Sequence, residues 1–151
     1  MSTETNTTPN PSVINPLPTN KGRITATGKR KNAVAALQYD VNKIKNFTIN
    51  DKSWLQYFPQ ERHQLKILSP FRVTEVPLFP MKFKVQGGGT TAQAEAIRHA
   101  ISKLLKTLNP LDLNLIKKLK KLGYITRDDR RVERKKPGQR GARATFNSKK
   151  R

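Results

Sequence analysis

The spacing of apolar residues divides the middle of this chain, from about residue 24 to residue 125, into strands and helices. Residues 23–28 and 33–39 are rich in β-branched and small apolar residues and flank a short basic segment, which predicts two strands joined by a turn. A further short strand is expected at residues 47–49. Strict alternation of apolar and polar residues at 81–85 predicts a half-buried strand.

Helical spacing appears after three consecutive glycines at residues 87–89. The pattern Thr90-x-x-Gln93 predicts a capping box that opens the clearest helix of the chain. Apolar residues then recur every three or four positions, so this helix is expected to pack on a sheet: Ala94, Ile97, Ile101, Leu104, Leu105 and Leu108. The opposite, polar face is expected to contain Gln93, Glu95, Arg98, His99, Ser102, Lys103 and Lys106.

A second helix is expected after Asn109 and Pro110, with Asp112 as its N-cap and Gly123 just beyond its end. Its apolar stripe consists of Leu115, Ile116, Leu119 and Leu122, opposite Lys117, Lys118, Lys120 and Lys121. The lysine side of this helix is expected either to face solvent or to contact RNA, and the overall positive charge favours contact with RNA.

The segment between the predicted strands is harder to interpret. Asn50 and Asp51 predict a turn, and Ser53 is expected to cap a single helical turn over residues 54–58. The aromatic residues of this turn, Trp54, Tyr57 and Phe58, are expected to pack together rather than stack on bases. Residues 60–68 fit a short helix or irregular structure, and Pro70, Pro77 and Pro80 are expected to bracket an edge-type segment.

Both ends of the chain differ in composition from the middle. Residues 1–21 are rich in Pro, Thr and Asn and are expected to form a disordered extension, because they cannot bury enough surface to offset the entropy of ordering. Residues 22–126 form the predicted globular domain. Residues 127–151 are predicted to be an extended basic arm, in which the stretch 134–151 has eight Lys or Arg and no acid.

Charge narrows the choice of partners. The chain of 151 residues has 31 Lys and Arg against 10 Asp and Glu, a net charge of +21. Such a chain favours a polyanionic partner, and a nucleic acid fits better than a membrane, because no apolar run is long enough for a span and no secretory signal is recognisable. The protein is therefore expected to be soluble and intracellular.

Catalytic and metal chemistry have little support in the sequence. The chain has no cysteine and only two histidines, so no metal site and no cofactor are expected. The three glycines could cradle a phosphate at a helix N-terminus, or they could form a tight turn that needs positive φ. A phosphotransferase using this loop is the enzymatic alternative, but the Walker lysine pattern is absent.

A basic arm of this density gains free energy by releasing counterions from a phosphate backbone, and arginine adds bidentate phosphate contacts. The alternatives are a solvated tail or a localisation signal. A further alternative is that the protein is a free-standing DNA- or RNA-binding module.

Several sequence blocks resemble the bacterial-type form of a universal family, small-subunit ribosomal protein number nine. The blocks occur in the order of the family and extend over about residues 22–151: GKRKNAVA at 28–35, YFP at 57–59, GGGTTAQA at 87–94, AIRH at 96–99, TRD at 126–128, RVERKK at 131–136 and the Lys-Arg terminus. The chain departs from the family at Ala36, Ala92 and Ala100, and in a longer C-terminal ending.

The resemblance implies an α+β fold: a mixed four- or five-stranded sheet with helices on one face, a left-handed βαβ crossover and a long basic C-terminal tail. It implies a non-enzymatic structural role in the small ribosomal subunit, with ribosomal RNA of the subunit head, peptidyl-site tRNA and neighbouring small-subunit proteins as partners. The expected location is the cytoplasmic ribosome of bacterial type, with a plastid or mitochondrial ribosome as the alternative.

By the same resemblance, two sets of residues are expected to contact RNA. The residues expected to bind ribosomal RNA are Lys29, Arg30, Lys31, Gly87, Gly88, Gly89, Arg98, Arg127, Arg130, Arg131, Arg134, Lys135, Lys136, Arg140 and Arg143. The residues expected to approach tRNA are Lys149, Lys150 and Arg151.

Overall fold

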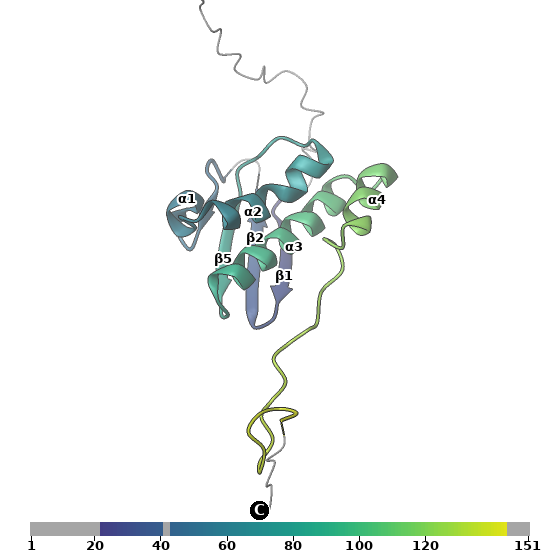
Figure 1. The fold of residues 1–151 in the computed structure, drawn as a ribbon. Coiled ribbons are helices and arrows are strands. Elements are labelled where there is room, and N and C mark those ends of the chain that lie inside the picture. The colour runs from purple at the N-terminus through teal and green to yellow at the C-terminus, as the bar shows by residue number, and fades with distance from the viewer. Residues whose placement is uncertain (1–21, 41–42, 145–151) are drawn as a thin grey trace, which may run out of the picture.

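The computed structural model describes residues 22–40 and 43–144. The described residues form a five-stranded sheet. Figure 1 shows two long helices, α2 and α3, lying across one side of the sheet. In chain order the elements are β1 (Ile24–Arg30), β2 (Ala33–Tyr39), β3 (Thr48–Ile49), β4 (Lys52–Ser53), α1 (Trp54–Tyr57), α2 (Glu61–Thr74), β5 (Lys82–Gln86), α3 (Thr90–Leu108) and α4 (Leu113–Lys121).

The sheet is mixed, with strand order β1-β2-β5-β3-β4. The pair β3 and β5 is parallel, and the other neighbouring pairs are antiparallel. The chain passes from β3 to its parallel neighbour through α1 and α2, as a βαβ crossover requires. The predicted α+β fold with a mixed five-stranded sheet is confirmed, and the left-handedness of the crossover stays a prediction.

Strands β1 and β2 form the predicted hairpin, in which Arg30 pairs with Ala33 and Ile24 pairs with Tyr39. Lys31 adopts a left-handed φ of 50° in the turn. Gly28 faces α3 so closely that a Cβ atom there would lie 1.9 Å from the carbonyl oxygen of Ala96. The hairpin and α3 therefore meet backbone to backbone, which only glycine permits at this position.

Helix α3 is the centre of the core, because it packs on the sheet and on α2. All six apolar residues predicted to face the sheet are buried. Ser102 and His99 are buried as well, so the prediction that both lie on a polar face is wrong. His99 lies between β1 and the segment after α4, where its ring contacts Lys29 and Ile125. In addition α2 packs on α3, so the buried surface of α3 is wider than the stripe that faces the sheet.

The predicted capping box is also wrong. The N-cap of α3 is Gly89, whereas Thr90 is already the first helical residue, so its hydroxyl is not at the capping position. Gln93 instead donates from Nε2 to the carbonyl oxygen of Gly87 at 3.1 Å.

Helix α2 extends well beyond the short helix considered for residues 60–68, and Pro70 lies inside it. The expectation that Pro70 brackets an edge-type segment is therefore wrong. A proline within a helix leaves the carbonyl four residues earlier without its N–H donor. Here that carbonyl belongs to Lys66, and Ser69 Oγ donates to it at 2.8 Å, which compensates for the lost bond.

Two further local predictions are confirmed, whereas Ser53 occupies the N-cap position of α1 without a capping hydrogen bond from its side chain. Trp54 stacks on Phe47 and Phe58 is fully buried, so the aromatic residues pack together as predicted. Asp112 caps α4 by accepting from the amide of Leu115 at 3.0 Å, and Gly123 follows the helix with a φ of 71°.

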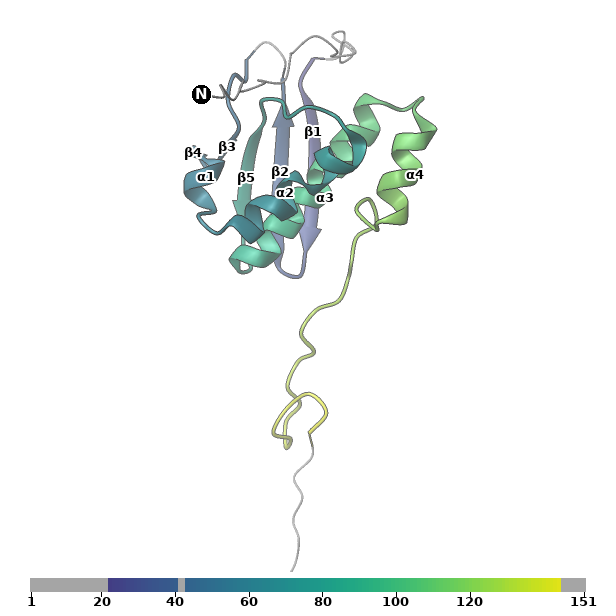
Figure 2. The same ribbon diagram turned by 45° about the horizontal axis from the view of Figure 1, so that its top comes forward.

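Beyond α4 the chain leaves the domain, as both ribbon views show (Figure 2). Residues 127–144 contain neither helix nor strand. The predicted disordered extension at 1–21 lies outside the described residues. None of the described helices is long and apolar enough to cross a membrane.

Candidate nucleic-acid interface

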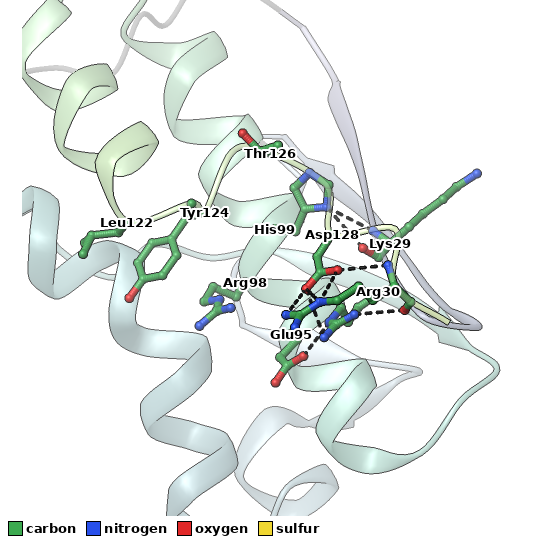
Figure 3. Close-up of a pocket in the computed structure, with 11 residues that line it drawn as sticks. Lys29, Arg30, Glu95, Arg98, His99, Leu122, Tyr124, Thr126 and Asp128 are labelled. Atoms are coloured by element: carbon green, nitrogen blue, oxygen red, sulfur yellow. Dashed lines mark hydrogen bonds and ion pairs between the residues drawn. The ribbon is translucent and has the colours of Figure 1, made fainter. Parts of the chain in front are cut away.

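A network of ion pairs joins β1, α3 and the start of the arm. Arg30 on β1 contacts Glu95 on α3 at 2.9 Å and Asp128 in the arm at 3.1 Å. The other carboxylate oxygen of Glu95 accepts from Lys66 on α2 at 2.8 Å, and Arg130 pairs with Asp128 at 2.7 Å. Figure 3 shows Arg30, Glu95 and Asp128 converging from β1, α3 and the arm. We call Arg30, Lys66, Glu95, Asp128 and Arg130 the clamp.

The clamp also includes a backbone contact, because Arg30 donates from Nη1 to the carbonyl oxygen of Arg130 at 3.2 Å. The Arg30 side chain is only 16% exposed, so this guanidinium is mostly withdrawn from solvent. The clamp therefore holds the first residues of the arm against the domain.

The two acids of the clamp are held in their charged form. Burial raises the pKa of Glu95, but hydrogen bonds from Lys66 and Arg30 outweigh this effect and bring the pKa below its usual value. The pKa of Asp128 is strongly lowered, chiefly by the side-chain hydrogen bond from Arg130. Both carboxylates therefore remain ionised at neutral pH.

His99 gives a second attachment between the domain and the start of the arm. Its Nε2 lies 3.0 Å from the carbonyl oxygen of Ile125, and its Nδ1 lies 3.3 Å from the amide nitrogen of Lys29. A neutral ring with the proton on Nε2 satisfies both, since Nε2 donates to Ile125 while Nδ1 accepts from Lys29. Burial, followed by the charge of Lys103, lowers the pKa of His99 and favours this neutral form.

A pocket of about 300 Å³ opens beside the clamp, between α3, the end of α4 and the arm. The guanidinium of Arg98 lies 4.5 Å from the centre of the Tyr124 ring on its wall. Three arginines line the pocket, Arg30, Arg98 and Arg130, against the two acids Glu95 and Asp128. The Lys29 side chain extends away from the other lining residues (Figure 3). Such a pocket suits an anionic group of a large ligand.

A second pocket, of about 440 Å³, lies at the N-terminus of α3. Lys31 and Arg131 line it, together with Gly88 and Gly89. Residues predicted from distant blocks of the sequence are thus brought together at both pockets.

The glycine loop has a structural explanation. Gly87 and Gly88 have φ of 72° and 65°, and a Cβ atom at Gly87 would lie 2.5 Å from the carbonyl oxygen of Asn32. The tight-turn interpretation is therefore correct for these two glycines, which let the loop pass close to the β1–β2 hairpin. Contact between the loop and phosphate stays a prediction.

The arm carries the remaining predicted cations. Within the described part, Arg143 pairs with Glu133 at 2.8 Å across exposed side chains. Arg127, Arg134, Lys135, Lys136 and Arg140 complete the set in residues 127–144. Lys149, Lys150 and Arg151, predicted to approach tRNA, lie outside the described residues. Among the described residues, no cluster of His, Asp or Glu suits a metal ion.

Four residues of the site were not predicted from the sequence: Lys66, Glu95, Tyr124 and Asp128. Helical spacing places Glu95 only on a polar helix face, and Asp128 appears in the sequence only as part of the block TRD at 126–128. One signal was available for the acids. With only 10 acids among 151 residues, each carboxylate within a basic block is a candidate partner for an arginine.

Comparison with known proteins identifies the family. The family model described as "Ribosomal protein S9/S16" matches residues 28–151. The chain belongs to this family. It is 46% identical to "Small ribosomal subunit protein uS9" of Rickettsia massiliae over 125 residues, covering 82% of this chain and 76% of the relative. It is 42% identical to the protein of the same name from Maridesulfovibrio salexigens over 127 residues, covering 83% and 95%.

Family membership has direct consequences for the class of protein. The chain is a structural, non-enzymatic component of the small ribosomal subunit, and the phosphotransferase alternative is therefore wrong. The bacterial relatives indicate a cytoplasmic ribosomal component.

Proposed function

We propose that this protein binds ribosomal RNA in the head of the small subunit through its basic arm and the cationic pockets at the base of the arm. The observation that carries this proposal is the clamp, because it fixes the arm to the domain at its origin while residues 127–144 form no helix or strand. An arm without regular structure can follow a phosphate backbone, and a fixed origin limits the directions it can take.

The chemistry proposed is phosphate neutralisation. Each phosphate contacted by a Lys or Arg releases condensed counterions, and the favourable entropy of this release drives binding. The side chains of Arg130 and Arg143 are largely exposed, so RNA phosphates can compete with Asp128 and Glu133 for these guanidinium groups. Ordering of the arm accompanies binding and reduces the net gain.

The finer part of the proposal concerns tRNA. The cationic residues Lys149, Lys150 and Arg151 are proposed to approach the backbone of peptidyl-site tRNA, with ribosomal RNA and neighbouring small-subunit proteins as the other partners. The support comes from the family and from the lysine and arginine residues that end the chain.

Sedimentation tests the first part of this proposal. The endogenous protein should travel with small subunits after a high-salt wash, because many simultaneous contacts hold it there. Recovery of the protein in the free fraction, with binding to naked nucleic acid, would instead favour a free-standing module.

Deletion of residues 148–151 tests the tRNA contact. The truncated protein should enter small subunits at near normal yield, because the domain and most cations of the arm remain. Affinity for tRNA at the peptidyl site should fall several-fold, since each lost contact contributes about 1 kcal/mol or less after screening. Unchanged tRNA affinity at low magnesium would reassign the terminus to ribosomal RNA.

A further inference from the structure

The side of the sheet opposite the helices has an unusual composition. Helix α3 packs on β1, β2 and β5 from one side, and none of the helices in residues 22–40 and 43–144 lies on the other (Figure 2). The residues that point to this uncovered side are alternate residues of the three strands. We call them the open sheet face: Thr25, Thr27, Lys29, Val34, Ala36, Gln38, Lys82, Lys84 and Gln86.

The strand register arranges the open sheet face in three rows. Thr25, Gln38 and Lys82 form the first row, and Lys29, Val34 and Gln86 form the last. The middle row contains Thr27, Ala36 and Lys84. All residues contributed by β1 and β5 are exposed, whereas those of the central strand β2 are half-buried between their neighbours.

The charged residues of the open sheet face are all positive. Three of its nine residues are lysines and none is acidic. Among the described residues, Asp51 reaches Lys82 from the neighbouring turn and forms an ion pair with it, which leaves an excess of two positive charges. A groove of about 510 Å³ borders this face, and it is lined by Gln38 of β2, by residues 82–85 of β5 and by Asn50 and Asp51 of the turn.

Composition favours a nucleic acid over a protein as the occupant. Protein interfaces are enriched in aromatic residues and Met and depleted in Lys, whereas this face has lysines, small side chains and no aromatic residue. Threonine hydroxyls, amides and ammonium groups all donate to phosphate oxygens. Reading of bases on a sheet requires aromatic side chains for stacking, and none is present here.

We infer that the open sheet face is a second RNA-binding surface, which contacts the sugar-phosphate backbone without reading base sequence. This inference rests on the proposed function, because it assumes that ribosomal RNA is the partner of the domain. It adds a surface on the far side of the sheet from α3. The protein is then held between two RNA segments, one along the pockets and arm and one along the sheet.

A crosslinking experiment in assembled subunits tests the inference. Since the chain has no cysteine, Thr27→Cys creates a unique thiol on the open sheet face, and Ala144→Cys creates one in the arm. Each full-length variant is labelled with a short photoreactive group, assembled into small subunits and irradiated. We expect both variants to form adducts with ribosomal RNA.

The two variants separate the inference from the proposed function. An RNA adduct from Ala144→Cys, with a protein adduct or no adduct from Thr27→Cys, overturns the inference and leaves the proposed function intact. Absence of RNA adducts from both variants overturns both.

A matched pair of lysine variants gives an independent measurement. Lys84→Gln removes a charge from the open sheet face, and Lys106→Gln removes one from the exposed side of α3. In binding to small-subunit ribosomal RNA, Lys84→Gln should flatten the log-log salt slope by about one and weaken affinity by about five-fold near 0.15 M salt. Lys106→Gln should match the unmodified chain, and equal values for Lys84→Gln overturn the inference.

Discussion

At the residue scale, Gly28 and His99 both owe their roles to contacts with residues distant in the sequence. Gly28 belongs to the sequence block at 28–35, but glycine is required there because the backbone of Ala96 lies so close. Ala96 is distant in the sequence, so no local pattern shows this requirement. His99 was assigned to a polar face and is instead a buried hydrogen-bonding residue. In both cases the decisive contact is long-range, and sequence spacing reports only local periodicity.

Replacement of Gly28 by Ala should destabilise the domain by about 3 kcal/mol or more, because the new methyl group meets backbone atoms that cannot move independently. Gly22→Ala is the matched control, since nothing lies within 4 Å of its Cβ position. Urea denaturation of both variants measures the effect. Equal midpoints would show that β1 and α3 do not approach as closely as described.

Stability should fall as pH is lowered from about 7.5 to about 5.5. The pKa values of His63 and His99 are lowered in the folded chain, chiefly by burial, from an ordinary value of 6.5. The unfolded chain therefore binds more protons in this range, and stability is lost as pH falls. Thermal unfolding of His63→Gln and His99→Gln variants should each show a weaker pH dependence, and an unchanged dependence in both would contradict the buried neutral rings.

At the element scale, hairpin β1–β2 and helices α3 and α4 were predictable because each has a local signal. For the hairpin it is β-branched and small apolar residues on both sides of a basic turn, for α3 it is helical spacing, and for α4 it is a cap with a terminal glycine. Helix α2 was not predictable, because Pro70 indicates a break when read locally. The helix tolerates Pro70 because the Ser69 hydroxyl bonds the free carbonyl of Lys66 and because α2 packs against α3. The clamp could not be predicted either. Its ion pairs join β1, α2, α3 and the arm, and such pairs leave no periodic pattern in the sequence.

Arg30→Gln should loosen the origin of the arm. Trypsin should then cut after Arg127 faster than in the unmodified chain, where first cuts are expected beyond the clamp. Arg143→Gln is the control, because it removes an exposed ion pair within the arm and leaves the clamp complete. Mass spectrometry of early fragments measures the rates, and equal cleavage after Arg127 in all three proteins would show that the clamp does not hold the arm.

At the scale of the whole molecule, composition was the most informative feature. A net charge of +21 pointed to a polyanion before any element was assigned, and the change in composition near residue 126 marked where regular structure ends. Composition does not show which cations form internal ion pairs and which lie on the free surface. That division depends on tertiary contacts, as Arg30 in the clamp and Lys84 on the open sheet face illustrate.

The most direct test of the account is the salt dependence of binding between the full chain and small-subunit ribosomal RNA. If several cations of the arm displace counterions, the plot of log affinity against log salt should have a slope on the order of minus four or steeper. Replacement of Arg134, Lys135 and Lys136 together by Ala should flatten this slope by up to about two. A slope near zero for the unmodified chain would contradict RNA binding through phosphate neutralisation.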